Sequence, residues 1–268
     1  MSIKDLSKLF ATALFVCILS IQGYTQEHLS KILANGEIRI GMTGEQAPFT
    51  MKNKEGKLMG YEVELARALA KSMGVRLVLV KMPFSKLMPA LEEGGIDAVM
   101  SGMTITPKRN MKALFAGPYM LSGKSLITRS EELSEITDLD EANDKNYKIA
   151  CLKGSTSEDF VRKSLPKVEV IVLDDYETGI EKVMNYEVDA MVADAPLCRV
   201  AEMEHGAEGL LMLNELLTVE PIGMALPPDD NQLLNLVENY LATLELSGVL
   251  VELEETWFES DEWMLDAE

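Results

Sequence analysis

Apolar and polar positions follow the same order in two stretches of the chain, about 92 residues apart. The first stretch covers residues 75–100 and the second covers residues 168–192. In each, an apolar strand is followed by a helix, a tight turn and a second apolar strand that carries the pair Asp-Ala, at Asp97 and at Asp189. This order of elements predicts two similar lobes, each built around an α/β unit.

The pattern outside these stretches predicts further elements of both units. Residues 61–73 place apolar side chains at helical spacing and stop at Gly74, which is typical of a helix C-terminus. The other expected elements are a helix over 27–35, a strand over 37–43, a hairpin-like excursion over 49–59, strands over 123–130 and from 147 and 221, a helix over 231–246, and a final amphipathic helix with Trp257 and Trp263.

The second unit is nested inside the first along the chain. We expect lobe 1 to consist of residues 24–126 plus 222–268, and lobe 2 of residues 127–221. The chain would then cross between the lobes near residues 123–130 and 218–225, and two crossing strands can act as a hinge under a cleft. The predicted fold class is α/β, with a mostly parallel sheet flanked by helices in each lobe.

Residues 1–23 have the pattern of a secretory signal peptide. Lys4 and Lys8 precede an apolar run over residues 9–21, which is short for a membrane-spanning helix of about 20 residues. No later segment is long and apolar enough to span a membrane. We therefore expect an exported protein with a periplasmic location.

Composition restricts the partners more than the fold. The chain has 268 residues, of which 47% are apolar, and it can form one large domain or two of about 100–120 residues. A net charge of −19 disfavours nucleic acid and anionic membranes as partners. Cys151 and Cys198 are expected to be two buried, unpaired thiols or one disulfide. The two histidines, His28 and His205, and the cysteine spacing provide no metal site, and we expect no cofactor.

Opposite charges follow the second strand of the two stretches. Arg109 ends the segment SGMTITPKR, and Asp194 follows the apolar run before ADAP. Open α/β sheets bind ligands beyond the carboxyl ends of their strands, so these charges suit a small molecule that carries both an anion and a cation. An arginine can hold a carboxylate through two parallel hydrogen bonds, and a buried aspartate needs a partner. The alternatives are a surface arginine at a helix start and an aspartate that caps a helix.

Smaller polar groups accompany these charges. Gly102 allows a close backbone approach, and the Thr104 hydroxyl can bond the same carboxylate as the arginine. Ser155 and Thr156 lie in a turn at a helix start, where N–H groups can bind an anion. The alternative is an ordinary capping turn in which one of these hydroxyls pairs with Glu158 or its neighbours.

Phe84 flanks a turn on the ligand side of lobe 1. It can cover an apolar part of the ligand or pack in the core. The sequence has no G-x-S-x-G elbow, no P-loop and no G-x-G-x-x-G loop, so signals of an enzyme are few.

Six segments occur in a characteristic order, namely GYEVELARALAKSMG, LMPALEEGGIDAVMSGMTITPKR, FAGPYMLSG, KGST, VDAMVADAP and LATLELSGVL followed by TWF. Over about residues 36–258 the chain thereby resembles the extracellular solute-binding proteins of family 3, the polar amino-acid receptors of ABC importers, which have the type II periplasmic binding protein fold. The resemblance implies that Arg109 and Thr104 hold the α-carboxylate of an amino acid, that the Ser155-Thr156 turn completes this site, and that Asp194 binds the α-ammonium group.

The resemblance implies a binding protein without catalytic residues. We expect a monomer that captures an amino acid between its lobes and delivers it to the permease of an ABC importer. One position departs from the family, because Gln46 stands where an aromatic residue often stacks on the ligand. With Glu45 beside it, the sequence predicts a ligand with a polar or cationic side chain.

Two other functions fit the same resemblance. Cyclohexadienyl (arogenate or prephenate) dehydratases share the fold, with an acid at the position of Glu158 and a tryptophan at that of Phe84, and a carboxylic acid in a closed cleft can protonate a leaving hydroxyl. The third candidate is an amino-acid sensor module. No transmembrane or signalling segment follows Glu268 in this sequence, which favours a freestanding receptor.

Overall fold

The two similar stretches of sequence lie in two separate five-stranded sheets of a computed structural model, which describes residues 27–267. The first sheet has the order β4 (Arg76–Lys81), β1 (Glu37–Met42), β5 (Ala98–Val99), β12 (Glu220–Leu226) and β6 (Leu114–Ser122). The second has the order β9 (Glu169–Leu173), β8 (Lys148–Leu152), β10 (Ala190–Asp194), β7 (Lys124–Thr128) and β11 (Leu211–Met212). The strands of the two sheets therefore correspond one to one, and the repeat in the sequence is also a repeat in the fold.

Each sheet combines parallel and antiparallel pairs. Strand β1 is parallel to β4 and β5, and β8 is parallel to β9 and β10. Strand β12 is antiparallel to both of its neighbours, β5 and β6, and β7 is antiparallel to both β10 and β11. Strand β10 is buried at every position, as its unbroken apolar run indicates. The predicted α/β fold with two lobes is confirmed.

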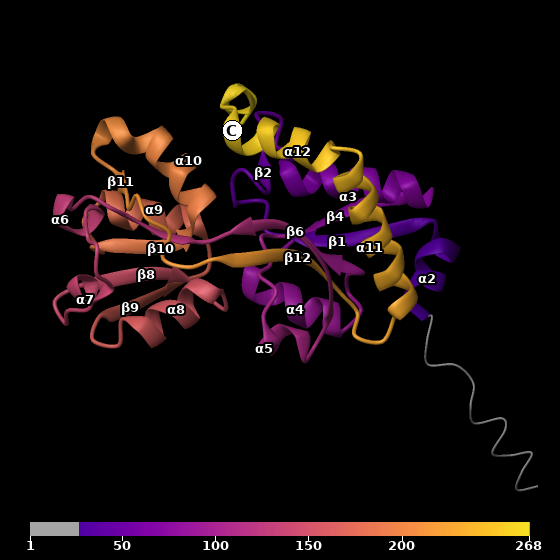
Figure 1. Cartoon of the computed structure of the whole chain (residues 1–268), viewed down its shortest axis with the longest axis horizontal. Helices are drawn as coiled ribbons and strands as arrows, with labels where there is room; N and C mark the ends of the chain where they lie inside the picture. Colours follow the sequence, from indigo (N-terminus) through magenta and orange to yellow (C-terminus); the bar gives the residue numbers. More distant parts are fainter. Residues whose placement is uncertain (1–26, 268) are drawn as a thin grey trace, which may run out of the picture.

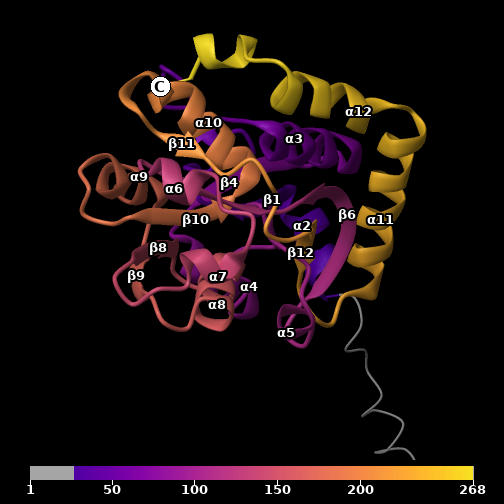
Figure 2. The same cartoon turned by 60° about the vertical axis from the view of Figure 1, so that its left-hand side comes forward.

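Helices cover both sheets (Figure 1). Helix α3 (Tyr61–Met73) ends at Gly74, which has the left-handed conformation that the sequence predicted. The other helices of the first lobe are α2 (Glu27–Asn35), α4 (Phe84–Glu92), the short α5 (Pro107–Asn110), α11 (Asn231–Leu246) and α12 (Val249–Glu254). Those of the second are α6 (Glu131–Ser134), α7 (Leu139–Ala142), α8 (Thr156–Ser164), α9 (Tyr176–Met184) and α10 (Ala195–His205). Figure 2 shows α11 and α12 along the outer side of the first lobe.

The chain changes sheets at two neighbouring places. Strand β6 of the first sheet ends at Ser122 and β7 of the second begins at Lys124, so Gly123 alone separates them. Gly123 lies so close to the returning chain that a Cβ atom there would be 2.2 Å from the carbonyl oxygen of Thr218. Figure 1 shows β6 and β12 leading toward the junction of the lobes. The lobe boundaries expected near residues 126 and 222 stay a prediction.

The C-terminal segment differs from the single amphipathic helix that we expected. After α12 the chain makes a π-helical turn over Glu255–Glu259, becomes extended at Ser260 and forms a 3₁₀ turn over Glu262–Leu265. Trp257 and Trp263 are six residues apart and would lie about 120° apart around a continuous helix. The break at Ser260 lets both indoles be buried against each other, with ring centroids 5.8 Å apart. Burial of both indoles explains why the helix does not continue.

The structure also tests smaller predictions about the hairpin, the cysteines and membrane-spanning helices. The hairpin is present as β2 (Met51–Lys52) and β3 (Leu58–Met59). Cys151 and Cys198 are buried and unpaired, which decides against a disulfide. Within residues 27–267, no helix has the length and apolar character needed to cross a membrane. The predicted signal peptide, residues 1–23, lies outside the described part of the chain.

Candidate functional site

The ends of the equivalent strands β5 and β10 bring the two predicted charges toward one another. Arg109 belongs to α5, and its Nη1 donates to the carbonyl oxygen of Thr104 at 2.8 Å. Its guanidinium carbon lies 5.5 Å from the ring centre of Phe84, which is itself buried. Burial lowers the pKa of Arg109, and the negative charges of Glu220 and Asp194 partly offset this effect. The side chain is therefore half-buried and faces acidic groups, unlike an ordinary surface arginine.

Asp194 is the last residue of β10 and is 3% exposed. Its Oδ1 accepts a hydrogen bond from Nζ of Lys124 at 2.5 Å, and its Oδ2 accepts one from Nε2 of Gln46 at 2.7 Å. The hydroxyl of Tyr176 lies 3.4 Å from Oδ2. Although Asp194 precedes α10, its side chain makes no capping hydrogen bond. The carboxylate therefore belongs to the interface between the lobes and not to the helix start.

Glu220, the first residue of β12, forms a second buried carboxylate. Its Oε2 accepts hydrogen bonds from the hydroxyls of Thr104 at 2.6 Å and Thr156 at 2.9 Å, and Nζ of Lys124 lies 3.3 Å away. Its Oε1 accepts from the hydroxyl of Thr218 at 3.2 Å. Burial acts to raise the pKa of this carboxyl, but the Lys124 charge and the hydrogen bonds outweigh burial, so the pKa of Glu220 is lowered.

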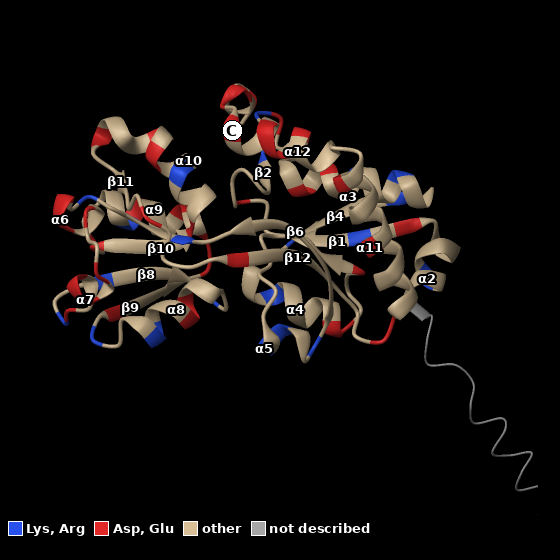
Figure 3. Ribbon diagram, viewed as in Figure 1, with Lys and Arg blue, Asp and Glu red and all other residues tan. Residues whose placement is uncertain are grey.

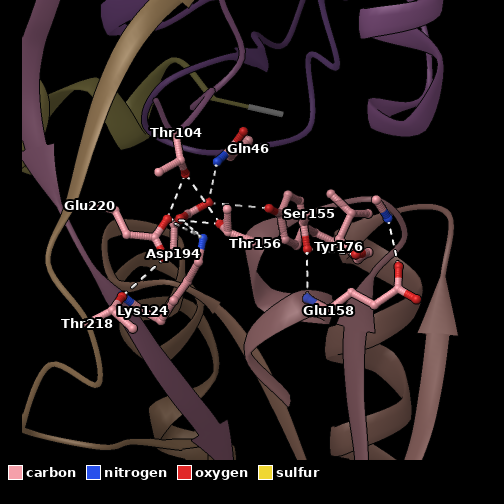
Figure 4. Close-up of polar contacts among 12 residues, drawn as sticks. Gln46, Thr104, Lys124, Ser155, Thr156, Glu158, Tyr176, Asp194, Thr218 and Glu220 are labelled. Carbon is pink, nitrogen blue, oxygen red and sulfur yellow. Dashed lines mark hydrogen bonds and ion pairs between the residues drawn. The ribbon is translucent and has the colours of Figure 1, made fainter. Parts of the chain in front are cut away.

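These contacts form one connected network at the junction of the lobes (Figure 4). We call its members the cleft network; they are Gln46, Thr104, Lys124, Thr156, Asp194 and Glu220. Gln46 and Thr104 come from the part of the chain that builds the first sheet, whereas Thr156 and Asp194 come from the second. The network therefore joins the two lobes through side chains.

The turn before α8 supplies one of its two predicted hydroxyls to the network. Ser155 instead caps α8: its Oγ accepts from the N–H of Glu158 at 3.2 Å and donates to the carbonyl oxygen of Leu152 at 2.6 Å. The carboxylate of Glu158 accepts from the N–H of Gly154 at 2.8 Å and from Nε of Arg162 at 3.0 Å. The capping turn considered from the sequence is therefore present, and Glu158 is bonded to its own helix and turn.

The backbone conformation at position 102 and the side chains around it explain why this residue is a glycine. It has a φ of +56°, and a Cβ atom there would lie 2.3 Å from Nε2 of Gln46. Its N–H donates at 2.9 Å to Oε1 of Glu62, a fully buried carboxyl that also accepts a hydrogen bond from the Tyr119 hydroxyl. Burial raises the pKa of Glu62 to about 7; the hydrogen bonds from Tyr119 and Gly102 act in the opposite direction, and the charge of Asp194 adds to the rise.

A cavity of about 580 Å³ lies beside the network, between the lobes. Glu45 and Lys81 line it from the first lobe, and their side chains form an ion pair at 2.5 Å. The second lobe contributes Asp174, Asp175 and Glu177. Acidic residues therefore outnumber basic ones on the walls of this cavity.

The structure brings most of the predicted site residues to one place. Arg109, Thr104, Thr156, Asp194 and Gln46 converge there, whereas Ser155 and Glu45 are bonded to other groups nearby. Their role in ligand binding stays a prediction. Among residues 27–267, no group of three histidines, cysteines or carboxylates could hold a metal ion.

Sequence reasoning missed three charged residues of this region: Lys124, Glu220 and Glu62. Lys124 and Glu220 each open a strand that is otherwise almost wholly buried, beside the predicted crossings. A charge at the start of a buried strand beside a hinge was the available signal. Glu62 lies on the buried face of α3, where an acid among apolar residues was the corresponding signal.

Known proteins of similar sequence and structure include both binding proteins and an enzyme. Cyclohexadienyl dehydratase of Pseudomonas aeruginosa is 29% identical over 265 residues, 96% of each chain. The L-cystine-binding protein TcyJ of Escherichia coli K12 is 28% identical over 244 residues, 91% of each chain. The crystal structure of the ancestral amino acid-binding protein AncCDT-1, a precursor of cyclohexadienyl dehydratase, matches with a TM-score of 0.80 at 33% identity, over 87% of this chain and 100% of the other.

These similarities confirm the two-lobed fold of type II periplasmic binding proteins. The family model of the bacterial extracellular solute-binding proteins, family 3, matches residues 38–260. Since that match spans most of the sequence and both lobes, the chain belongs to family 3 of the bacterial extracellular solute-binding proteins.

Proposed function

We propose that the protein is an extracytoplasmic receptor that captures an amino acid between its lobes and delivers it to the permease of an ABC importer. The observation that carries the proposal is the convergence of Arg109 and Thr104 from one lobe with Thr156 and Asp194 from the other. A cation with hydroxyls suits an α-carboxylate, and a buried carboxylate suits an α-ammonium group. The similarity to an L-cystine-binding protein and to an ancestral amino acid-binding protein supports the same ligand class.

In this mechanism, the cleft closes because only the closed form brings both sets of groups onto the ligand. The α-carboxylate docks on Arg109, whose planar guanidinium donates two parallel hydrogen bonds. Rotation about the crossing strands then adds the groups of the second lobe. Charge-assisted hydrogen bonds of this kind contribute about 1.5–3 kcal/mol each.

The adjacent cavity supports a preference for polar or cationic side chains. Glu45, Asp174 and Asp175 place negative charge on its walls, with Lys81 paired to Glu45. Acidic residues are also spread over both lobes as a whole (Figure 3). A ligand with an ammonium or guanidinium tail would be favoured over an anionic one by this field.

Titration calorimetry with the common amino acids tests the proposal. We expect at least one to bind, and we expect Arg109→Ala to weaken that binding by at least about 2 kcal/mol, about 30-fold, because the ligand carboxylate loses its partner in a buried site. Arg199→Ala is the matched control, because Arg199 is exposed and pairs with Glu202 on its own helix. Near-native affinity of Arg109→Ala for every ligand would refute the placement.

Export and partnership belong to the same proposal. The segment 1–23 would direct the chain out of the cytoplasm, and the closed receptor would act as a monomer at the permease. Cell fractionation, sizing by light scattering and co-purification with a reconstituted importer test these points separately.

A dehydratase is the second candidate, favoured by the similarity to cyclohexadienyl dehydratase over 96% of both chains. The acid expected for such an enzyme, Glu158, accepts hydrogen bonds from Gly154 and Arg162. Both contacts engage Glu158 within its own turn and helix, which supports the binding function. Turnover of prephenate or arogenate by the purified protein would overturn the assignment as a receptor without enzymatic activity.

A further inference from the structure

We propose that the ion pair of Lys124 and Glu220 imitates the head group of an amino acid. The pair holds the lobes together without a ligand, and a zwitterionic ligand must displace it in order to bind. The first half of this inference concerns only the chain itself. The second half, displacement, rests on the proposed function.

Lys124 takes the place expected for the ammonium group of the ligand. Its Nζ lies 2.5 Å from Oδ1 of Asp194, and the two side chains are only 2% and 4% exposed. The other oxygen of Asp194 accepts a hydrogen bond from Gln46 and lies 3.4 Å from the Tyr176 hydroxyl. An ammonium ligand therefore reaches this carboxylate only if Lys124 withdraws.

Glu220 takes the place expected for the carboxylate. Its Oε2 accepts hydrogen bonds from the hydroxyls of Thr104 and Thr156, which are the hydroxyls predicted to bind the carboxylate of the ligand. The same oxygen lies 3.3 Å from Nζ of Lys124. One internal ion pair thus presents an anion and a cation side by side, as the head group of an amino acid does.

The position of this pair couples it to closure. Lys124 opens β7 and Glu220 opens β12, so both stand at the junction of the sheets (Figure 4). Glu220 bonds Thr104 of one lobe and Thr156 of the other. Separating the lobes would break these bonds, and also the bond between Gln46 and Asp194. The pair therefore stabilises the closed arrangement over an open one.

Charge balance gives the reason for displacement. Arg109 and Lys124 supply two positive charges, and Asp194 and Glu220 supply two negative ones, so these four charges balance. A zwitterion added to this set would have to compete with Lys124, which is already paired with both buried carboxylates. Buried charges are tolerated only when paired, so the ligand must replace the internal pair and not add to it.

The first test measures closure without any ligand. Bound ligand is removed by unfolding in denaturant, dialysis and refolding, and the separation of the lobes is measured by small-angle X-ray scattering and by fluorescence energy transfer between labels on the two lobes. The double variant Lys124→Met, Glu220→Gln is compared with the wild type. The control is Lys182→Met, Glu187→Gln, which removes a more exposed ion pair of the second lobe.

We expect the stripped wild type and the control to be closed, and the Lys124/Glu220 variant to have a larger radius of gyration and a longer distance between labels. An open wild type, or a variant as closed as the wild type, would overturn the first half of the inference. If circular dichroism shows that the double variant does not fold, Glu220→Gln alone takes its place, with the same expected opening.

The second test measures competition. If the internal pair must be displaced, the wild type binds only through the fraction of molecules in which the pair has opened, and the double variant should bind its best amino acid at least about tenfold more tightly. Equal or weaker binding by the variant would refute displacement. Failure of all three proteins to bind any amino acid would refute the proposed function and displacement together, whereas the closure result would stand independently.

Discussion

Replacing Glu62 by glutamine should change how the stability of the protein depends on pH. Glu62 is fully buried, and its pKa is raised from 4.5 to about 7. Its Oε1 accepts hydrogen bonds from Gly102 and Tyr119, whereas its Oε2 has no partner among the described residues. The protonated carboxyl is thus the form that the folded protein prefers, and a glutamine side chain imitates it.

The direction and size of the effect follow from proton linkage. Between about pH 4.5 and pH 7 the folded protein keeps the Glu62 proton while the unfolded chain loses it, so stability falls as the pH rises through this window. The interval corresponds to about 3 kcal/mol at 1.36 kcal/mol per pH unit. We therefore expect Glu62→Gln to match the wild type near pH 4.5 and to exceed its stability by up to about 3 kcal/mol at pH 8.

Urea unfolding of both proteins at a series of pH values checks this expectation. The difference between them isolates Glu62, because the other titrating groups are common to both. Glu238→Gln, an exposed substitution on α11, serves as the control and should show no such trend. A difference between Glu62→Gln and the wild type that stays constant from pH 5 to pH 8 would refute the reasoning.

Three further outcomes follow from local geometry. Gly102→Ala should lower stability by about 2 kcal/mol or more in urea unfolding, because its φ is positive and its Cβ would meet Gln46; unchanged stability would contradict the contact. Cys151 and Cys198 should resist iodoacetamide in the folded protein and react once it unfolds, as peptide mapping would show, because burial raises the pKa of both thiols, that of Cys151 to about 12. Trp263→Ala should cost about 3 kcal/mol or more of unfolding free energy through the loss of its indole packing, and a melting temperature equal to that of the wild type would argue against that packing.

The repeated pattern predicted the lobes well because it reflects burial. Residues 75–100 and 168–192 each show strand and helix periodicities that packing against a sheet demands, and both form the expected elements. The charges beyond the strand ends were visible for the same reason, since Asp194 stands directly after an apolar run and Arg109 ends the polar segment that follows the equivalent run.

The partners of those charges were not visible. Lys124 and Asp194 are 70 residues apart, and Thr104 and Glu220 are 116 apart. Such pairs depend on how the chain crosses between sheets, which periodicity within a single element does not encode. The C-terminal break was missed for a similar reason, because the packing of the two indoles overrides the helical pattern of that segment.

The order of strands in the first sheet also governs when that sheet can form. Strand β12 lies between β5 and β6, yet it is the last strand to be synthesised, about 100 residues after them. The strands of the second sheet all lie within residues 124–212 and can pair before β12 emerges. Because sheets built from distant segments must close long loops, the inner lobe should fold first, and the first lobe should remain incomplete until nearly the whole chain has left the ribosome or the export machinery.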